Sequence, residues 1–312
     1  MIISASRRTD IPAFYSEWFI NRIREGYVMV RNPMNYNSIS KISLNPSLID
    51  CIVFWTKNPK PMFDYLDEIN KKYMFYFQYT LNPYDKDVEP NIAPLDEKIK
   101  TFISLSKKIG KERVIWRYDP IVITKKYTKE WHINNFEYIC EKISKYTDVC
   151  VFSFVDYYNK ITNNLKSIGT ENIDLVTINL IVEKFSIIAK KYNIILKTCS
   201  EEIDLQKYDI EHSCCIDPIL MAKLLNCNLL TKKDANQRSI CGCVESVDIG
   251  QYNTCLHGCK YCYANYSYSN ALKNNNMHIK ESPLLLGEVT LNDKITERKI
   301  KSLKDFRMSF FE

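Results

Sequence analysis

The sequence predicts an α/β protein: a complete or partial parallel β/α (TIM-like) barrel followed by a segment rich in cysteine. Three observations support this prediction. Short apolar runs alternate with amphipathic stretches along most of the chain, runs such as residues 51–55 are apolar at every position, and cysteines crowd into the stretch from Cys199 to Cys262. Continuous apolar runs are typical of strands buried on both faces, as in parallel sheets. A doubly wound open sheet uses the same units and is the alternative.

The expected strands and helices follow one another in regular order. Strands are predicted at residues 1–4, 27–31, 51–55, 74–80, 113–117, 149–154 and 194–198. Amphipathic helices are predicted at residues 15–24, 62–71, 96–108, 129–145 and 173–191. This alternation implies a succession of right-handed β-α-β units. A further short strand at residues 212–216 would close the barrel.

The character of the chain changes near Met221, which divides it into two parts. Residues 1–220 are expected to form the β/α barrel. Residues 221–312 are expected to form a cysteine-rich, cluster-binding segment and a carboxyl-terminal tail packed on the barrel, and the tail is amphipathic over residues 295–306. The chain has seven glycines and no glycine-rich phosphate loop after a strand, which argues against a nucleotide-binding fold of that kind.

Composition favours a cytoplasmic protein. The first residues lack the pattern of a secretory signal, and no stretch is apolar over the length of a membrane helix, so no membrane partner is expected. Twelve cysteines in such a chain argue against a disulfide framework, because cytosolic thiols stay reduced. Cys51, Cys140 and Cys150 lie among apolar residues and are expected in the core. The net charge of +6 is spread over helix faces and gives weak support for nucleic-acid binding.

Charged side chains directly follow several predicted strands, at the sheet edge where α/β proteins build their sites. Arginine, lysine and aspartate next to buried apolar runs are costly unless they are paired or functional. We therefore expect these side chains to line a pocket and to orient a substrate, either a small molecule or a macromolecule. The candidates are Arg7, Arg8, Asp10, Lys57, Arg117 and Asp119.

The motif that carries chemistry is C-x3-C-x2-C, formed by Cys255, Cys259 and Cys262. Three thiolates on one tight loop can hold three irons of a [4Fe–4S] cluster and leave the fourth iron open to a small ligand. Gly258 allows the loop to turn sharply. Tyr261 is expected to pack against the cluster and limit the access of solvent.

Zinc is the alternative metal for this motif. Structural zinc sites favour paired C-x2-C knuckles and a fourth ligand, which His257 or Cys243 would have to supply. Only one C-x2-C pair occurs in this run. The spacing therefore favours an iron–sulfur cluster.

A second set of cysteines lies upstream of the motif. Cys199, Cys215, Cys241 and Cys243 are candidates for a second cluster, with Cys214 pointing into the core. The alternatives are a zinc site, one extra ligand for the first cluster, or unligated thiols, because spacing alone rarely fixes a ligand set. Glu201 and Glu202 follow Cys199 and are candidate acid–base groups.

The cysteine motif with Tyr261 resembles that of the radical S-adenosylmethionine superfamily. Its surroundings, His257-Gly258-Cys259 and Tyr261-Cys262-Tyr263-Ala264, are most similar to the spore photoproduct lyase-like branch. Over nearly its whole length the chain also resembles an uncharacterised bacterial family with radical-SAM-like carboxyl-terminal cysteines. Four segments carry that resemblance, at residues 6–12, 54–59, 116–120 and 215–217. In the superfamily the cysteines follow the first strand, whereas here they follow all the β/α units, as in a permuted order.

This resemblance implies a radical enzyme. The open iron would bind the amino and carboxylate groups of S-adenosylmethionine, with Arg7, Arg8 or Lys57 as candidate partners for the carboxylate. A reductant such as flavodoxin or ferredoxin would supply one electron, giving methionine and a 5′-deoxyadenosyl radical that removes a hydrogen atom from the substrate.

Two other classes of function remain open at this stage. One is a non-radical iron–sulfur protein that carries electrons or acts as a Lewis acid. The other is a zinc-stabilised module that binds nucleic acid, since aromatic side chains and cations can stack bases and the chain has 21 tyrosines. Cleavage of S-adenosylmethionine would favour the radical enzyme. A cluster that does not react with this molecule would favour the non-radical protein, and a colourless zinc protein would favour the zinc-stabilised module.

Overall fold

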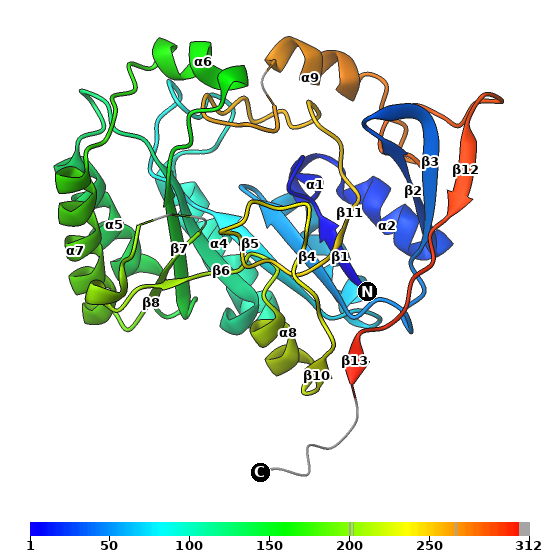
Figure 1. Cartoon of the computed structure of the whole chain (residues 1–312), viewed down its shortest axis with the longest axis horizontal. Helices are drawn as coiled ribbons and strands as arrows, with labels where there is room; N and C mark the ends of the chain where they lie inside the picture. The colour runs from blue at the N-terminus through cyan, green and yellow to red at the C-terminus, as the bar shows by residue number, and fades with distance from the viewer. Residues whose placement is uncertain (200, 202, 266, 306–312) are drawn as a thin grey trace.

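The protein, described here from a computed structural model, is built on one large parallel sheet (Figure 1). The structure describes residues 1–305 except 200, 202 and 266. The strand order is β11-β1-β4-β5-β6-β7-β8-β9, and every pairing is parallel. The strands are β1 (Ile2–Ala5), β4 (Cys51–Thr56), β5 (Phe75–Thr80), β6 (Val114–Ile121), β7 (Val149–Phe154), β8 (Ile195–Thr198), β9 (Glu211–His212) and β11 (Val247–Asp248). No pairing joins β9 to β11 among the described residues, so the sheet order has two ends.

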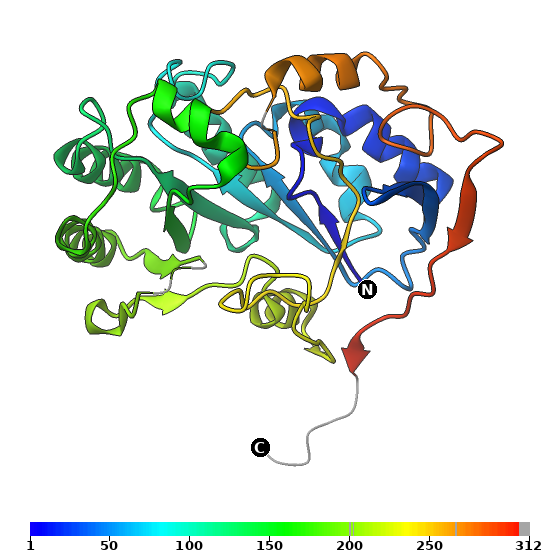
Figure 2. The same ribbon diagram turned by 45° about the horizontal axis from the view of Figure 1, so that its top comes forward.

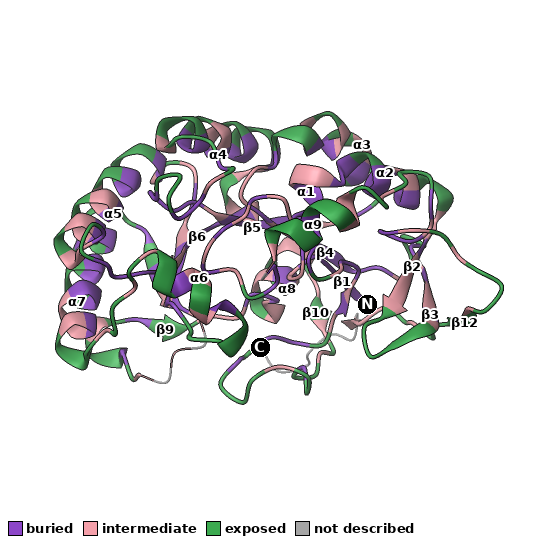
Figure 3. Ribbon diagram, turned by 90° about the horizontal axis from the view of Figure 1, so that it is seen from above, coloured by how far each residue is buried: buried purple, intermediate pink, exposed green. Residues whose placement is uncertain are grey.

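Helices α2, α3, α4, α5 and α7 cover the outer side of the curved sheet (Figure 3). The short helix α8 packs on the inner face. With its row of helices on one side, the arrangement is compatible with a partial β/α barrel and differs from a doubly wound sheet, which has such rows on both faces. The α-helices are α1 (Ile11–Phe14), α2 (Ser16–Glu25), α3 (Leu66–Asn70), α4 (Leu95–Ile109), α5 (Lys129–Ile143), α6 (Thr162–Ser167), α7 (Leu175–Lys191), α8 (Pro218–Leu225) and α9 (Tyr268–Asn275). Short 3-10 helices are η1 (Lys60–Tyr65), η2 (Lys111–Arg113), η3 (Asn159–Ile161) and η4 (Gln206–Tyr208). None of the helices in the described part of the chain is long and apolar enough to cross a membrane.

The prediction is wrong for one strand of the main sheet. Residues 27–31 do form a strand, β2 (Tyr27–Asn32), but it pairs antiparallel with β3 (Asn35–Ser43). Together with β12 (Lys294–Glu297) these strands form a separate three-stranded sheet. The physical reason is the short turn after Asn32, which returns the chain as a hairpin, so that β4 pairs with β1 instead.

The carboxyl-terminal part adds short strands that no long apolar run predicts. β11 extends the main sheet beside β1, and β10 (Asn228–Leu229) pairs with β13 (Lys304–Asp305). The further strand expected at 212–216 is the two-residue β9, one residue earlier. The amphipathic tail expected at 295–306 contains most of β12 and all of β13, and Phe306 lies outside the described residues.

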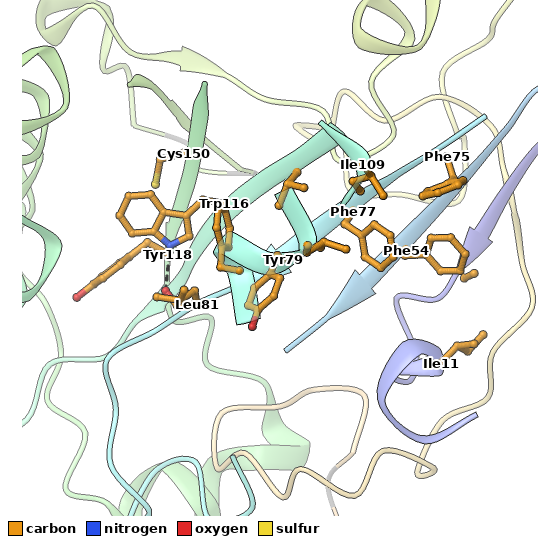
Figure 4. Close-up of a cluster of buried hydrophobic side chains, with 14 of the residues drawn as sticks. Ile11, Phe54, Phe75, Phe77, Tyr79, Leu81, Ile109, Trp116, Tyr118 and Cys150 are labelled. Atoms are coloured by element: carbon orange, nitrogen blue, oxygen red, sulfur yellow. Dashed lines mark hydrogen bonds between the residues drawn. The ribbon is translucent and has the colours of Figure 1, made fainter. Parts of the chain in front are cut away.

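Alternating residues of the strands enter two cores. On the outer side, Phe54 stacks on Phe77 with ring centroids 4.8 Å apart, and Phe136 of α5 stacks on Phe185 of α7 at 3.8 Å. Figure 4 shows part of this core, where the Trp116 indole N–H donates to the Leu81 carbonyl oxygen. Burying each such aromatic side chain contributes about 1.5–3 kcal/mol.

The inner face of the sheet is closed by the segment that carries the second set of cysteines. Ile2, Val53 and Tyr76 point to this side and form a second core with Ile216 and Met221. The expected core positions of three cysteines are confirmed, since Cys51, Cys140 and Cys150 are fully buried. The cysteine-rich stretch therefore packs against the strands themselves.

Candidate functional site

Two cavities lie beside the carboxyl ends of the main strands. The larger has a volume of about 430 Å³ and the smaller about 160 Å³. They share part of their lining, namely Arg7, Trp55, Lys57, Thr80, Tyr261, Cys262 and Tyr263. The two cavities are therefore neighbours with a common wall.

The first set of cysteines, Cys255, Cys259 and Cys262, lines the smaller cavity. It lies in the segment between β11 and α9, which runs beside α1 in Figure 2. Gly258 turns this loop with φ +71°, a left-handed conformation that suits glycine. The three cysteines therefore border one cavity, and their binding of a metal stays a prediction.

Asp10 ties the cysteine loop to the sheet. Its Oδ1 accepts a hydrogen bond from the Ala13 amide at 2.9 Å and caps α1. Its Oδ2 accepts from the Lys57 amide at 2.7 Å and contacts His257 Nε2 at 2.8 Å. Three separate segments therefore meet at one buried carboxylate. The Nδ1 atom of His257 is buried and has no hydrogen-bond partner among the described residues.

Glu89 is a site residue that the sequence analysis missed. It is buried and accepts from Lys57 Nζ at 2.8 Å, from Lys98 Nζ at 3.4 Å and from the Tyr261 hydroxyl. Burial alone would raise the pKa of Glu89, but the charges of Lys57 and Lys98 outweigh it and hold the pKa at about 2. No local pattern marks Glu89, because its partners come from three other segments.

The basic side chains near β1 are paired with acids. Arg7 lines both cavities and lies 3.6 Å from Asp234, while Arg8 lines the smaller cavity and lies 3.9 Å from Asp248. Asp248 also accepts from the Arg7 amide at 2.9 Å and from two serine hydroxyls of the β1 end. Asp234 and Asp248 were not among the candidates, and both come from the carboxyl-terminal part.

The second set of cysteines, Cys199, Cys215, Cys241 and Cys243, lines the larger cavity. The Sγ atoms of Cys199 and Cys215 are 3.4 Å apart. The Cys243 side chain lies near enough to Cys215 and to Cys241 to affect the pKa of both thiols. The structure therefore brings together the four residues that the sequence proposed as a set. Cys214 is half-buried beside Gly242 rather than in the core.

Arg117 contacts the second set of cysteines, and Asp119 contacts Arg117. Arg117 is buried, and its Nη1 donates to Cys215 Sγ at 3.1 Å while its Nε donates to Asp119 Oδ2 at 2.9 Å. Asp119 also accepts from the Ser153 hydroxyl. Burial would raise the pKa of Asp119, but the Arg117 guanidinium and the Ser153 hydrogen bond lower it. Both residues line the larger cavity, as expected.

One of the two candidate acid–base glutamates has an altered pKa. Burial raises the pKa of Glu201 to about 7, against the hydrogen bond that its Oε1 accepts from the Phe154 amide at 2.8 Å. A carboxyl group that titrates near neutral pH can both give and take a proton. Glu202 lies outside the described residues.

No disulfide joins two cysteines in the described part of the chain. Within the part of the chain that the structure describes, no three His, Cys, Asp or Glu side chains are grouped closely enough to hold one metal ion.

Fold and site together define a parallel β/α protein with two cysteine sets at adjoining cavities. Compared with known families, residues 2–264 match the sequence model of a domain of unknown function, DUF1848. The chain belongs to this family. No curated protein and no solved structure gives a match.

Proposed function

We propose that this protein is a radical S-adenosylmethionine-type enzyme whose [4Fe–4S] cluster is held by Cys255, Cys259 and Cys262. The observation that carries the proposal is the position of these three free thiols on one loop that lines a single cavity. Three thiolates leave one iron of a cubane without a protein ligand. A ligand of that iron would lie at the smaller cavity, which these three cysteines line.

The donor set and its surroundings suit a cluster, in which each thiolate binds a different iron, rather than a single metal ion. Burial raises the pKa of the Cys259 thiol overall, so this group is protonated until a metal binds. The nearby Lys57 ammonium opposes that rise and places a positive charge beside the sulfur. Lys57 also lies over the Tyr261 ring, 5.3 Å from its centroid. A positive charge and an aromatic ring beside the sulfurs are the means by which a protein stabilises and shields a cluster.

When bound, the cluster would use S-adenosylmethionine and an electron from a donor such as flavodoxin or ferredoxin to supply a 5′-deoxyadenosyl radical. The side chains at the shared wall would orient the other molecules. Arg7 and Lys57 line both cavities and can bind a carboxylate, while Trp55 and Tyr263 offer faces for a planar ring. Arg117 and Asp119 would hold the substrate from the far side of the larger cavity.

Twelve cysteines, with no disulfide among those that the structure describes, also support the expectation of a reducing compartment such as the cytoplasm.

The test is to purify the full chain without oxygen and to count iron, sulfide and zinc. Reductant and S-adenosylmethionine are then added, and 5′-deoxyadenosine is measured. Wild-type protein should contain iron and sulfide and form this product, and C255S/C259S should lose the product. Cys227→Ser is the matched control, because Cys227 is half-buried and lines neither cavity.

Other outcomes would replace the proposal. Iron that C255S/C259S removes, without any 5′-deoxyadenosine, would favour a non-radical iron–sulfur protein that transfers electrons or acts as a Lewis acid. Stoichiometric zinc with no iron would favour a zinc-stabilised module, and binding to nucleic acid would then be the next measurement.

A further inference from the structure

Sulfur atoms from three separate segments meet at the wall of the larger cavity. Cys199 directly follows β8 and Cys215 follows β9, two strands that pair in parallel with Thr198 opposite His212. Cys241 and Cys243 come from the loop between β10 and β11. Parallel pairing brings the ends of β8 and β9 to one edge, so the first two thiols come into contact at 3.4 Å.

Hydrogen-bond donors are directed at these sulfurs. The Ile216 amide donates to Cys243 Sγ at 3.4 Å, and the Arg117 guanidinium donates to Cys215 Sγ at 3.1 Å. A buried cysteine that only fills space behaves as a small apolar side chain, and a buried cation beside it would not be stabilised. Donors aimed at sulfur instead stabilise thiolates and are typical of the surroundings of iron–sulfur clusters.

The loop that carries Cys241 and Cys243 packs closely against Cys214. A Cβ atom added at Gly242 would lie 2.6 Å from Cys214 Sγ. Glycine therefore permits Cys241 and Cys243 to approach the Cys214–Cys215 segment from the other side. Cys241 and Cys243 are both buried, yet they line the cavity.

We propose that Cys199, Cys215, Cys241 and Cys243 hold a second [4Fe–4S] cluster at the larger cavity, whose lining also includes Cys262. Four thiolates are the usual ligand set of such a cluster. A structural zinc ion is normally enclosed by its ligands, whereas these thiols border a cavity of about 430 Å³ that also holds Arg7 and Arg117. The two arginines offset the negative charge of four thiolates. This assignment goes beyond the proposed function and does not depend on it.

Binding would separate Cys199 from Cys215, because each thiolate takes a different iron. Both follow short strands at the end of the sheet, and Cys199 is half-buried, so side-chain rotation can provide this movement.

The test compares metal content in four forms of the full chain purified without oxygen: wild type, C241S/C243S, C255S/C259S and the control Cys227→Ser. Wild type and Cys227→Ser should contain about eight irons and eight sulfides per chain. Each double variant should retain about half of that iron. The first site can therefore fail while the second is still counted, because C255S/C259S reports on the second set alone.

Two results would overturn the second cluster. One is iron content that C241S/C243S leaves unchanged. The other is one zinc per chain that the same variant removes. If C241S/C243S does not fold, Cys199→Ser at the half-buried position replaces it, and the reduced protein is examined by electron paramagnetic resonance. Wild type should then give two overlapping cluster signals and Cys199→Ser an altered second signal, whereas a single unaltered signal contradicts the proposal.

Discussion

The two cysteine sets reach adjoining cavities by different routes. The first set comes from eight consecutive positions, residues 255–262, on one loop. The second is gathered from residues 199–243 by the pairing of β8 with β9 and by a loop that packs on the inner face of the sheet. A local motif carries its geometry in its spacing, whereas a dispersed set depends on the fold.

The supports of the two sets differ as well. The first loop is fastened by buried charges, at Asp10 and at the group of Glu89, Lys57 and Lys98. The second set is held by apolar packing, by Arg117 and by hydrogen bonds to the Cys215 carbonyl. Variants that remove one kind of support should therefore affect one set more than the other.

The largest effect is expected for Glu89→Gln. This change leaves Lys57 and Lys98 without their shared counter-charge, and Lys98 is almost fully buried. Removing one partner of a buried ion pair costs about 3–5 kcal/mol. The free energy of unfolding, measured with denaturant on metal-free protein, should fall by that amount, and iron at the first set should be lost before iron at the second.

The control for this prediction is Glu68→Gln, which breaks the solvent-exposed ion pair with Arg24. Exposed pairs contribute little, so its effect on stability should be far smaller. Equal losses in the two variants would show that the buried group does not support the first loop.

The same difference between local and dispersed features explains which parts of the fold and of the site the sequence predicts. Long apolar runs predicted β4, β5, β6 and β7 within a few residues, because such runs need burial on both faces. β11 was missed, since two residues beside β1 carry no periodic signal. Residues 27–31 were assigned to the wrong sheet, because a strand's pattern does not identify its partner. Glu89 was missed for a related reason, as its three partners are distant in sequence.

The second prediction concerns how stability depends on pH through His132, which lies near the residues that support the first set. His132 of α5 is buried between the Tyr118 hydroxyl, 2.8 Å from Nδ1, and the Val122 carbonyl oxygen, 3.0 Å from Nε2. Its ring lies against Tyr84, which in turn packs on Tyr261. Burial lowers the pKa of His132 from 6.5 to about 4.

Because the folded pKa of His132 is below the unfolded value, the unfolded chain binds more protons between those two values. Stability from this group is therefore complete above pH 6.5 and is lost as pH falls towards 4, by roughly 3 kcal/mol. Denaturant unfolding across this range should show a steeper decline in wild type than in His132→Gln. Parallel curves for the two proteins would contradict the assignment.

A third prediction separates the two sets by their chemistry without metal. The Sγ atoms of Cys199 and Cys215 are 3.4 Å apart, against about 2.05 Å in a disulfide, so the side chains must move closer before the bond can form. The bond would link positions 16 residues apart. Metal-free protein exposed to air should form this disulfide and gain at most about 3 kcal/mol, less any strain. Peptide mapping by mass spectrometry checks it, with Cys199→Ser as the control. A disulfide found within residues 255–262 instead would reverse the comparison.

The smallest effects are expected from two buried tyrosines that hold the two sets in matched ways. The Tyr15 hydroxyl donates to the Thr254 carbonyl oxygen at 2.6 Å, next to Cys255. The Tyr76 hydroxyl donates to the Cys215 carbonyl oxygen at 2.7 Å. Each substitution by phenylalanine removes one hydroxyl and little volume.

The two changes should nevertheless differ in cost. Gln78 Nε2 also donates to the Cys215 carbonyl oxygen, at 3.0 Å, so Tyr76→Phe leaves that acceptor with a partner. The same change removes the acceptor of the Asp217 amide at 3.2 Å, but Asp217 is half-buried, so water can replace it. Tyr15→Phe removes the hydroxyl that the buried Thr254 carbonyl oxygen uses, and an unsatisfied buried acceptor costs about 1–3 kcal/mol. We expect a loss of about 1 kcal/mol or less for Tyr76→Phe and a larger one for Tyr15→Phe, measured by denaturant unfolding. If Tyr76→Phe is the more damaging, then the dispersed set, not the compact loop, depends more on single hydrogen bonds.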